Sequence, residues 1–264
     1  MEKKTRKIIL IIIAVIMFLT GLYIFLKPKI NNYLYEIKAE EIIESFYQAY
    51  WPQDETSERL DVPEPTTTAA TETEPEPTER IYPELYAAMQ EYNKEIYENK
   101  QVGLADPWCY TAQIIKLSDY GVDGETIGVL SIPKMEFEAP VFLGATYAHL
   151  DEGTAQLSIS SMPIGGINTN CVIAGHRGWY GAEHMRRIDA LEIGDTVTLT
   201  TFWDVLRYKV VETKIIEPYQ PEELLIQEGR ELLTLVTCHP YGSGGKQRYV
   251  VYCERQYDDA KGIE

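Results

Sequence analysis

The apolar positions divide the chain into an N-terminal part with helical patterns and a C-terminal part with strand patterns. Residues 8–26 form a run without a charged residue, and a helix of about 20 residues matches a hydrocarbon core of roughly 30 Å. Residues 35–50 and 83–99 carry apolar side chains at helical spacing, and Pro83 stands at the start of the second segment. The sequence therefore predicts one membrane-spanning helix and two amphipathic helices.

From residue 127 onward, short apolar runs alternate with turn residues, which is typical of a mainly β domain with short helices. The expected strands are 127–132, 139–143, 171–174, 196–202, 205–216, 232–237 and 249–253. We expect a helix at 182–191 and a weaker turn at 221–225. No period of about 20 to 50 residues repeats, so a closed or nearly closed β-barrel is the most economical arrangement.

Residues 51–82 differ from the rest of the chain because Pro, Thr and Glu dominate and apolar side chains are almost absent. Such a segment cannot bury enough apolar surface to offset the entropy lost on ordering, so it predicts a flexible stalk. The expected organisation is a cytoplasmic tail at 1–7, an anchor at 8–26, a membrane-proximal helix at 27–50, the stalk at 51–82, a helix with its following loop at 83–110, the barrel at 111–255 and a polar tail at 256–264.

The charges around residues 8–26 indicate how this anchor is oriented. Its N-terminal flank is denser in basic residues than its C-terminal flank, which holds Lys27 and Lys29. The positive-inside rule predicts a single-pass protein of the cell membrane, with the N-terminus inside and the barrel outside. No small-residue cleavage pattern follows the apolar run, which favours an uncleaved anchor over a removed signal peptide. A Gram-positive surface and a bacterial periplasm both fit this topology.

The composition excludes some classes of function. The 264 residues are 45% hydrophobic, enough for one sizeable domain. With 41 acidic against 24 basic residues the net charge is −17, so we expect no nucleic-acid partner. The four Cys form no CxxC pair and the His are spread out, so we expect no metal and no cofactor. Cys171 and Cys253 lie in expected strands, and the sequence leaves open whether they pair.

Candidate chemistry lies at the end of the expected strand 232–237. Cys238 follows this strand directly, and Arg248 precedes the strand 249–253. Two consecutive strands joined by a short loop form an antiparallel hairpin most simply, which places both residues at one edge of the sheet. A nearby guanidinium favours thiolate and can stabilise an oxyanion. The alternative is a buried free Cys and a surface Arg on an ordinary hairpin.

Of the four histidines, His176 is the candidate acid or base. It follows an expected strand in the run Gly-His-Arg-Gly, where the glycines let the backbone approach closely. His149 lies in a polar loop and His184 in an expected surface helix, while His239 neighbours the thiol but points away from it. Arg177 is the competing cation, but it would point away from His176, so Arg248 is preferred.

Together, Thr-Leu-Val-Thr-Cys ending at Cys238, the following His-Pro-Tyr-Gly, Arg248 and the loop of His176 resemble the sortases. The resemblance covers roughly residues 83–255 and is strongest to class C, the pilin-polymerising enzymes. It implies a sortase-type closed β-barrel in which Cys238, His176 and Arg248 are catalytic.

A tripeptide before the barrel also resembles class C. In that class an Asp-Pro-Trp or Asp-Pro-Phe segment acts as a lid over the site. The corresponding run is Asp106-Pro107-Trp108. The resemblance implies that Asp106 meets Arg248 and that Trp108 caps Cys238. Without the Cys, His and Arg set, this tripeptide would be interpreted as a loop turn with one packed aromatic residue.

The resemblance implies a transpeptidase that cleaves an LPxTG-like sorting signal between Thr and Gly. Cys238 would form a thioester, Arg248 would stabilise the oxyanion, and His176 would protonate the leaving amine. The implied partners are pilin or surface proteins that bear the signal and an acceptor amine, most simply a pilin Lys. A peptidoglycan-precursor amine, another extracytoplasmic cysteine enzyme that does not need Arg248, and a non-catalytic surface module stay open as alternatives.

Two features differ from the class C pattern. Class C members commonly carry a second hydrophobic segment after the catalytic domain, whereas residues 256–264 are polar. The acidic stalk at 51–82 also separates helices that the class connects more tightly. Both differences concern how the helices pack and leave the proposed catalytic residues unaffected.

Overall fold

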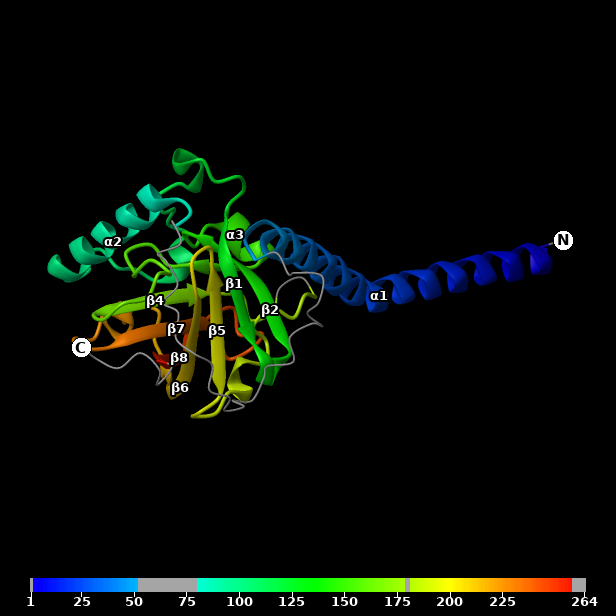
Figure 1. The fold of residues 1–264 in the computed structure, drawn as a ribbon. Helices are drawn as coiled ribbons and strands as arrows, with labels where there is room; N and C mark the ends of the chain where they lie inside the picture. The colour runs from blue at the N-terminus through cyan, green and yellow to red at the C-terminus, as the bar shows by residue number, and fades with distance from the viewer. Residues whose placement is uncertain (1, 52–79, 179–180, 258–264) are drawn as a thin grey trace, which may run out of the picture.

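The computed structural model describes residues 2–51, 80–178 and 181–257 (Figure 1). Eight strands form a closed barrel in the order β1-β2-β3-β4-β7-β8-β6-β5, which confirms the mainly β, closed-barrel prediction. The strands are β1 (Thr126–Ile132), β2 (Phe137–Leu143), β3 (Thr154–Gln156), β4 (Thr169–Ala174), β5 (Thr196–Thr201), β6 (Val205–Ile216), β7 (Glu231–His239) and β8 (Gln247–Arg255).

Strands β4 and β7 are neighbours in the barrel and are buried over most of their length. They pair in parallel, and every residue of β4 and the first seven residues of β7 are buried, as expected for strands covered on both faces. Strand β8 pairs antiparallel with β7 to form the predicted hairpin, and its other edge pairs with β6. The consequence is that residues at the end of β4, the end of β7 and the start of β8 share one rim of the barrel.

The strands include all seven that the apolar runs predict, most of them a few residues longer. β3 and the helix α3 (Tyr147–Glu152) were not predicted, because segments of three and six residues are too short to show a period. The expected turn near 221–225 is the 3-10 helix Pro221–Leu224.

The helix predicted at 182–191 is wrong. This segment is a series of turns that contains only the 3-10 helix Ile188–Ala190. Ala182, Met185 and Ile188 are all buried. Successive turns point these side chains inward at a three-residue spacing, which resembles the spacing of a helical stripe.

The helix α1 (Glu2–Tyr50) runs without interruption through the segments predicted as an anchor and a membrane-proximal helix. Its N-terminal half projects away from the barrel (Figure 1), and its apolar side chains there are exposed. An 18-residue window with a mean hydropathy of 3.0 makes it a candidate membrane span. The C-terminal half packs on the barrel through the buried residues Ala39, Ile43 and Phe46, and Phe46 stacks on Phe202 with ring centroids 5.6 Å apart.

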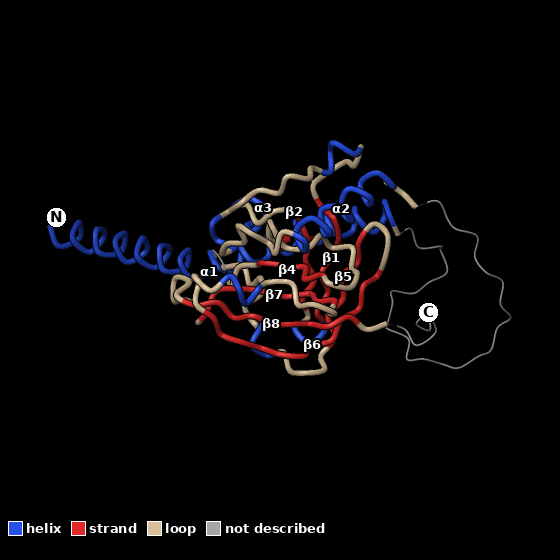
Figure 2. The backbone as a smooth tube through the Cα atoms, turned by 90° about the vertical axis from the view of Figure 1, so that its left-hand side faces the viewer, coloured by secondary structure: helices blue, strands red, loops and turns tan. Residues whose placement is uncertain are grey.

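The helix α2 (Pro83–Glu98) lies where its apolar stripe predicts. Leu85, Met89, Tyr92 and Ile96 are buried and belong to the same core as the barrel strands. Figure 2 shows the barrel and both long helices after a quarter turn of the view. The predicted stalk falls almost entirely on 52–79, outside the described residues.

The four cysteines are free, which answers the question of a Cys171–Cys253 disulfide. Both residues align with Leu233 of β7, Cys171 from one side and Cys253 from the other. Two strand spacings of about 4.8 Å separate them, and a disulfide needs Cα atoms within about 7 Å. These two thiols therefore serve as buried packing residues.

Candidate active site

Cys238 and Arg248 face each other at the rim of the barrel. They are direct partners in the β7–β8 register, and Arg248 Nη1 lies 3.8 Å from Cys238 Sγ. Gly245 brings the connecting loop over this pair, since a Cβ there would lie 3.2 Å from Cys238 Sγ. Arg248 is 6% exposed. A buried cation therefore stands directly beside the thiol.

The register of β4 and β7 brings His176 to the same rim. Ala174 pairs with Val236, so the same parallel offset places His176 level with Cys238. The loop is fixed where it leaves the strand, because Thr237 Oγ1 donates a hydrogen bond of 2.7 Å to the carbonyl oxygen of Gly175. His176 is 4% exposed. The structure thus brings Cys238, His176 and Arg248 together at one end of the barrel. Cys238 lies near the end of β7, His176 follows the end of β4, and Arg248 lies near the start of β8.

The segment Asp106-Pro107-Trp108 covers this rim. Arg248 Nε and Nη2 donate to Asp106 Oδ2 and Oδ1 at 2.7 and 2.9 Å, a two-pronged ion pair with both side chains largely buried. The Trp108 ring centroid lies 4.4 Å from Arg248 Cζ and 6.3 Å from the His176 ring. Asp106 Oδ1 also accepts a hydrogen bond of 3.0 Å from the Trp108 backbone N–H, which fixes the turn.

The electrostatics of the rim favour neutral resting groups. Burial raises the pKa of the Cys238 thiol, and Asp106 raises it further, while Arg248 and Arg177 lower it. Burial lowers the pKa of His176, and Asp151 partly offsets this. Both shifts act against a thiolate–imidazolium pair while the lid segment 106–108 covers the site. Removing the Asp106 carboxylate from the rim would favour the thiolate.

Comparisons with known proteins agree with this geometry. A family model described as a sortase domain matches residues 130–256. The chain carries a sortase domain. Sortase D of Bacillus subtilis (strain 168) is 31% identical over 134 residues, which are 50% of this chain and 65% of that relative's length. The chain therefore spans slightly less than two thirds of the length of this curated relative.

Solved structures show the same likeness. Sortase C1 of GBS Pilus Island 1 is 26% identical with a TM-score of 0.62 and covers 71% of this chain and 89% of that one. Sortase C2 of Group B Streptococcus Pilus Island 1 is 28% identical with a TM-score of 0.60 and covers 67% of this chain and 97% of that one. The likeness extends well beyond the part of the chain that the family model matches.

The remaining charged groups of the sortase domain near the rim form a second cluster. Arg177 is buried and pairs with Asp189 at 2.6 Å. It also donates to His239 Nδ1 at 2.7 Å, so that ring nitrogen accepts and the imidazole is neutral. Desolvation and the Arg177 charge both lower the pKa of His239. Arg177 is thus engaged by Asp189 and His239, and its charge also lowers the pKa of the Cys238 thiol.

Two histidines of the sortase domain differ from their expected surroundings. His149 lies in α3 rather than a loop, stacked on Phe142, with Nδ1 2.7 Å from the carbonyl oxygen of Gly144. His184 was expected on a surface helix but is 6% exposed, with its ring centroid 5.8 Å from that of His176. Polar neighbours such as Glu183 and Arg186 hide this burial from the sequence pattern.

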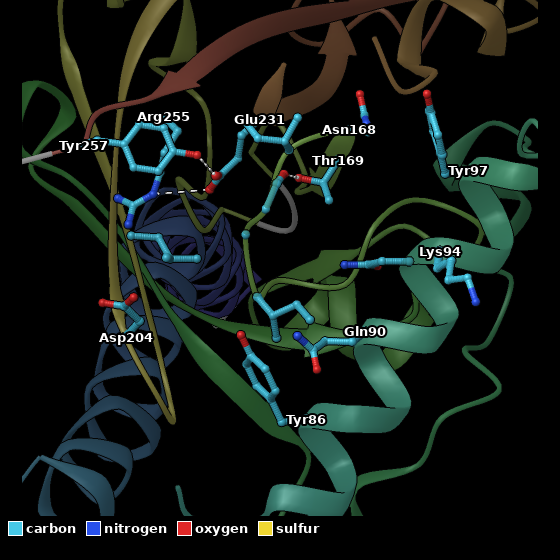
Figure 3. A pocket seen from close by; sticks show the side chains of 16 residues that line it. Tyr86, Gln90, Lys94, Tyr97, Asn168, Thr169, Asp204, Glu231, Arg255 and Tyr257 are labelled. Carbon is cyan, nitrogen blue, oxygen red and sulfur yellow. Dashed lines mark hydrogen bonds and ion pairs between the residues drawn. The ribbon is translucent and has the colours of Figure 1, made fainter. Parts of the chain in front are cut away.

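A cavity of about 520 Å³ lies at the opposite end of the sortase barrel, between α2 and the strand ends (Figure 3). Its most buried charged group is Glu231, the first residue of β7. Arg255 Nε lies 3.2 Å from Glu231 Oε1, and the hydroxyls of Tyr208 and Tyr257 both donate to this carboxylate. Three neighbours thus hold this carboxylate in place. The cavity is distinct from the rim of Cys238, because Glu231 begins β7 and Cys238 lies near the other end of that strand.

Proposed function

We propose that the chain is a membrane-anchored cysteine transpeptidase that cleaves an LPxTG-like sorting signal between Thr and Gly. The observation that carries the proposal is the juxtaposition of Cys238 and Arg248, with Sγ and Nη1 3.8 Å apart, beside the buried His176 on the aligned strand end. Arg248 is the feature that an ordinary cysteine peptidase does not need. It gives the site a fixed cation where an oxyanion would form.

In the proposed acylation step, the Cys238 thiol first gives its proton to His176, and the resulting thiolate Sγ attacks the carbonyl carbon of the signal's Thr. A C–S bond forms, and the electron pair of the C=O moves to oxygen, where the Arg248 guanidinium stabilises it. As the tetrahedral intermediate collapses, the Thr–Gly C–N bond breaks. Protonated His176 gives its proton to the departing amine of Gly. The products are a thioester on Cys238 and a peptide that begins with Gly.

In the proposed second step, an acceptor amine attacks the thioester and gives its proton to His176. A new amide bond forms and the Cys238 thiolate leaves, which restores the enzyme. The class C structures among the neighbours and the contact of Asp106 with Arg248 favour a pilin Lys as this amine, that is, pilus assembly. A peptidoglycan-precursor amine is the second candidate acceptor.

The lid must open for this chemistry. In the closed site, Arg248 donates twice to Asp106 and also to the carbonyl oxygens of Gly245 and Gln247. The guanidinium has five N–H groups, so little donor capacity is left for an oxyanion. We therefore interpret the structure as the resting form, in which Asp106 takes the place that the developing negative charge would occupy.

The apolar half of α1 serves as the anchor in this proposal, with the N-terminus inside and the sortase domain outside the membrane. Its exposed apolar side chains support a lipid environment, because no protein surface covers them within the described part of the chain. The charge asymmetry described above supports the orientation.

The test uses the full chain in detergent micelles with a fluorogenic LPxTG peptide and hydroxylamine as the acceptor. We expect wild-type protein to form the hydroxamate and Cys238→Ala to form none. Full activity of Cys238→Ala would refute the proposal. Incubation with a candidate pilin then separates the acceptors, because a ladder of covalent multimers indicates a pilin Lys, whereas transfer to a wall-precursor analogue without a ladder indicates wall anchoring.

A further inference from the structure

The sortase domain is attached to α1 close to its catalytic rim. Gly181 lies so near the helix that a Cβ there would be 2.6 Å from Pro28 Cα. The backbone N–H of Glu183 donates a hydrogen bond of 2.8 Å to Asn32 Oδ1. The ring of Tyr35 lies 4.2 Å from the ring of His184. One face of α1 therefore contacts three residues of the segment 181–184.

The last residue of this segment, His184, and the next residue, Met185, contact the loop of His176. The backbone N–H of Met185 donates to the carbonyl oxygen of His176 at 3.0 Å, and the Met185 side chain packs against Gly175. The ring of His184 meets the ring of His176 edge to face, with centroids 5.8 Å apart. His184 itself has a positive φ of 44°, a conformation that its surroundings must enforce.

The His176 ring thus has two aromatic neighbours. Trp108 of the lid lies at 6.3 Å and His184 at 5.8 Å. The ring of Tyr35 of α1 in turn contacts the ring of His184. The rings form a continuous series from the membrane helix to the lid, and the lid is the only member of this series that leaves when the site opens. His184 and Tyr35 then remain as the support.

The support acts through the shape of its rings rather than through hydrogen bonds. Tyr35 Oη and His184 Nδ1 are buried and make no hydrogen bond within the described residues. Burial, with the nearby His176, lowers the pKa of His184 to about 3, so this ring stays neutral while its neighbour changes protonation. Asp151 of α3 is the charged group that acts on both Tyr35 and His176.

We propose that α1 is a positioning element of the active site, in which Tyr35 seats His184 and His184 fixes the imidazole of His176 relative to Cys238. The proposal rests on the proposed function, because it assigns the support of that reaction's acid and base. Misplacement of a reacting group by about 1 Å can cost on the order of 100-fold in rate. A helix that only tethers the domain would have no such effect.

The test compares Tyr35→Ala with Tyr33→Ala in the full chain in micelles. Tyr33 is the matched control because it is the same residue type on the same helix and is 62% exposed. We expect Tyr35→Ala and His184→Ala to lower kcat by about 10-fold or more with KM nearly unchanged, and Tyr33→Ala to behave as wild type. Tyr35→Phe should keep its activity, since it retains the ring and removes only a buried hydroxyl that makes no hydrogen bond within the described residues.

Two measurements keep the outcome decisive. Alkylation of Cys238 reports whether the site has folded, so a variant with normal alkylation and low kcat has lost positioning alone. Wild-type kcat and pH profile in both Tyr35→Ala and His184→Ala would overturn the proposal. If the wild type does not cleave the peptide, the proposed function fails, and NMR titration of the His176 ring then tests the support alone, with a changed titration in Tyr35→Ala supporting it and an unchanged one refuting it.

Discussion

The hairpin of β7 and β8 carries an arginine–carboxylate pair at each end, and the two pairs are built differently. At one end Arg255 contacts Glu231, which is anchored in the adjacent strand of the same sheet. At the other end Arg248 contacts Asp106, which comes from a loop 142 residues away in sequence. The first carboxylate cannot leave without unfolding the barrel. The second is attached to a short segment that lies on the surface of the rim.

This difference separates an ion pair fixed within the sheet from one that movement of a short segment would break. A carboxylate fixed in the sheet, with two tyrosine hydroxyls donating to it, satisfies its arginine permanently. A carboxylate on a loop satisfies its arginine only until a competing anion or substrate displaces it. We therefore expect changes at Glu231 and Arg255 to reduce stability, and changes at Asp106 and Arg248 to alter chemistry.

The largest effect is expected at the structural end. Glu231→Ala removes a buried carboxylate from the half-buried Arg255 and from two tyrosine hydroxyls, and breaking a buried pair typically costs about 3–5 kcal/mol. The free energy of unfolding from denaturant titration should fall by this amount, while kcat/KM measured well below the transition should stay within about twofold of the wild type. A loss of activity without a loss of stability would mean that the far end of the hairpin takes part in the reaction.

The next effect concerns the arginines as a matched pair. Arg248→Ala should lower kcat/KM for the sorting peptide by about 10²–10³-fold, the usual cost of removing an oxyanion donor. Arg255→Ala, seven positions along the same strand, should lower stability and leave the rate nearly unchanged. Steady-state kinetics with active-site titration of Cys238 checks both. Equal losses of kcat/KM in the two variants would mean that both arginines affect the reaction. That result would contradict the expectation that Arg255 contributes to stability alone.

The smallest effect is expected from the lid. Asp106 raises the pKa of Cys238, so Asp106→Asn should lower that pKa and increase the thiolate fraction at neutral pH. Iodoacetamide labelling at pH 7 should be about two- to fivefold faster, and its pH dependence should shift to lower pH. Trp108→Ala, as the control, should increase labelling at all pH values without this shift. Identical labelling curves for the wild type and Asp106→Asn would argue that the lid does not act on the thiol.

Much of the barrel and the rim could be predicted from the sequence because both depend on short-range patterns. Alternating or continuous apolar runs bounded by turns located most strands, and the hairpin alone placed Arg248 beside Cys238. The sequence indicated only that His176 and Cys238 both lie at strand ends. The parallel register of β4 and β7, which places them level, depends on a pairing between distant segments and was not predicted.

The supporting residues could not be predicted in this way. His184 lies among charged residues, and its burial arises from contacts with α1, which is some 150 positions away. The three-residue spacing around it suggested a helix, although the segment is a series of turns. Glu231 and Arg255 likewise look like ordinary surface charges in the sequence. Burial created by distant packing leaves no local pattern.

The contact between Gly181 and Pro28 also determines how far the loop of His176 lies from the apolar half of α1. Only Lys27 separates Pro28 from the end of the apolar run at Leu26, and one residue adds roughly 1.5 Å of helix rise. With α1 as the anchor, the loop that carries His176 stands at the level of the lipid headgroups. The helix continues through Pro28 without a break, so the rim and the apolar run lie close together along α1. If the proposed function and this anchor both hold, the donor and the acceptor amine would be joined close to the membrane surface.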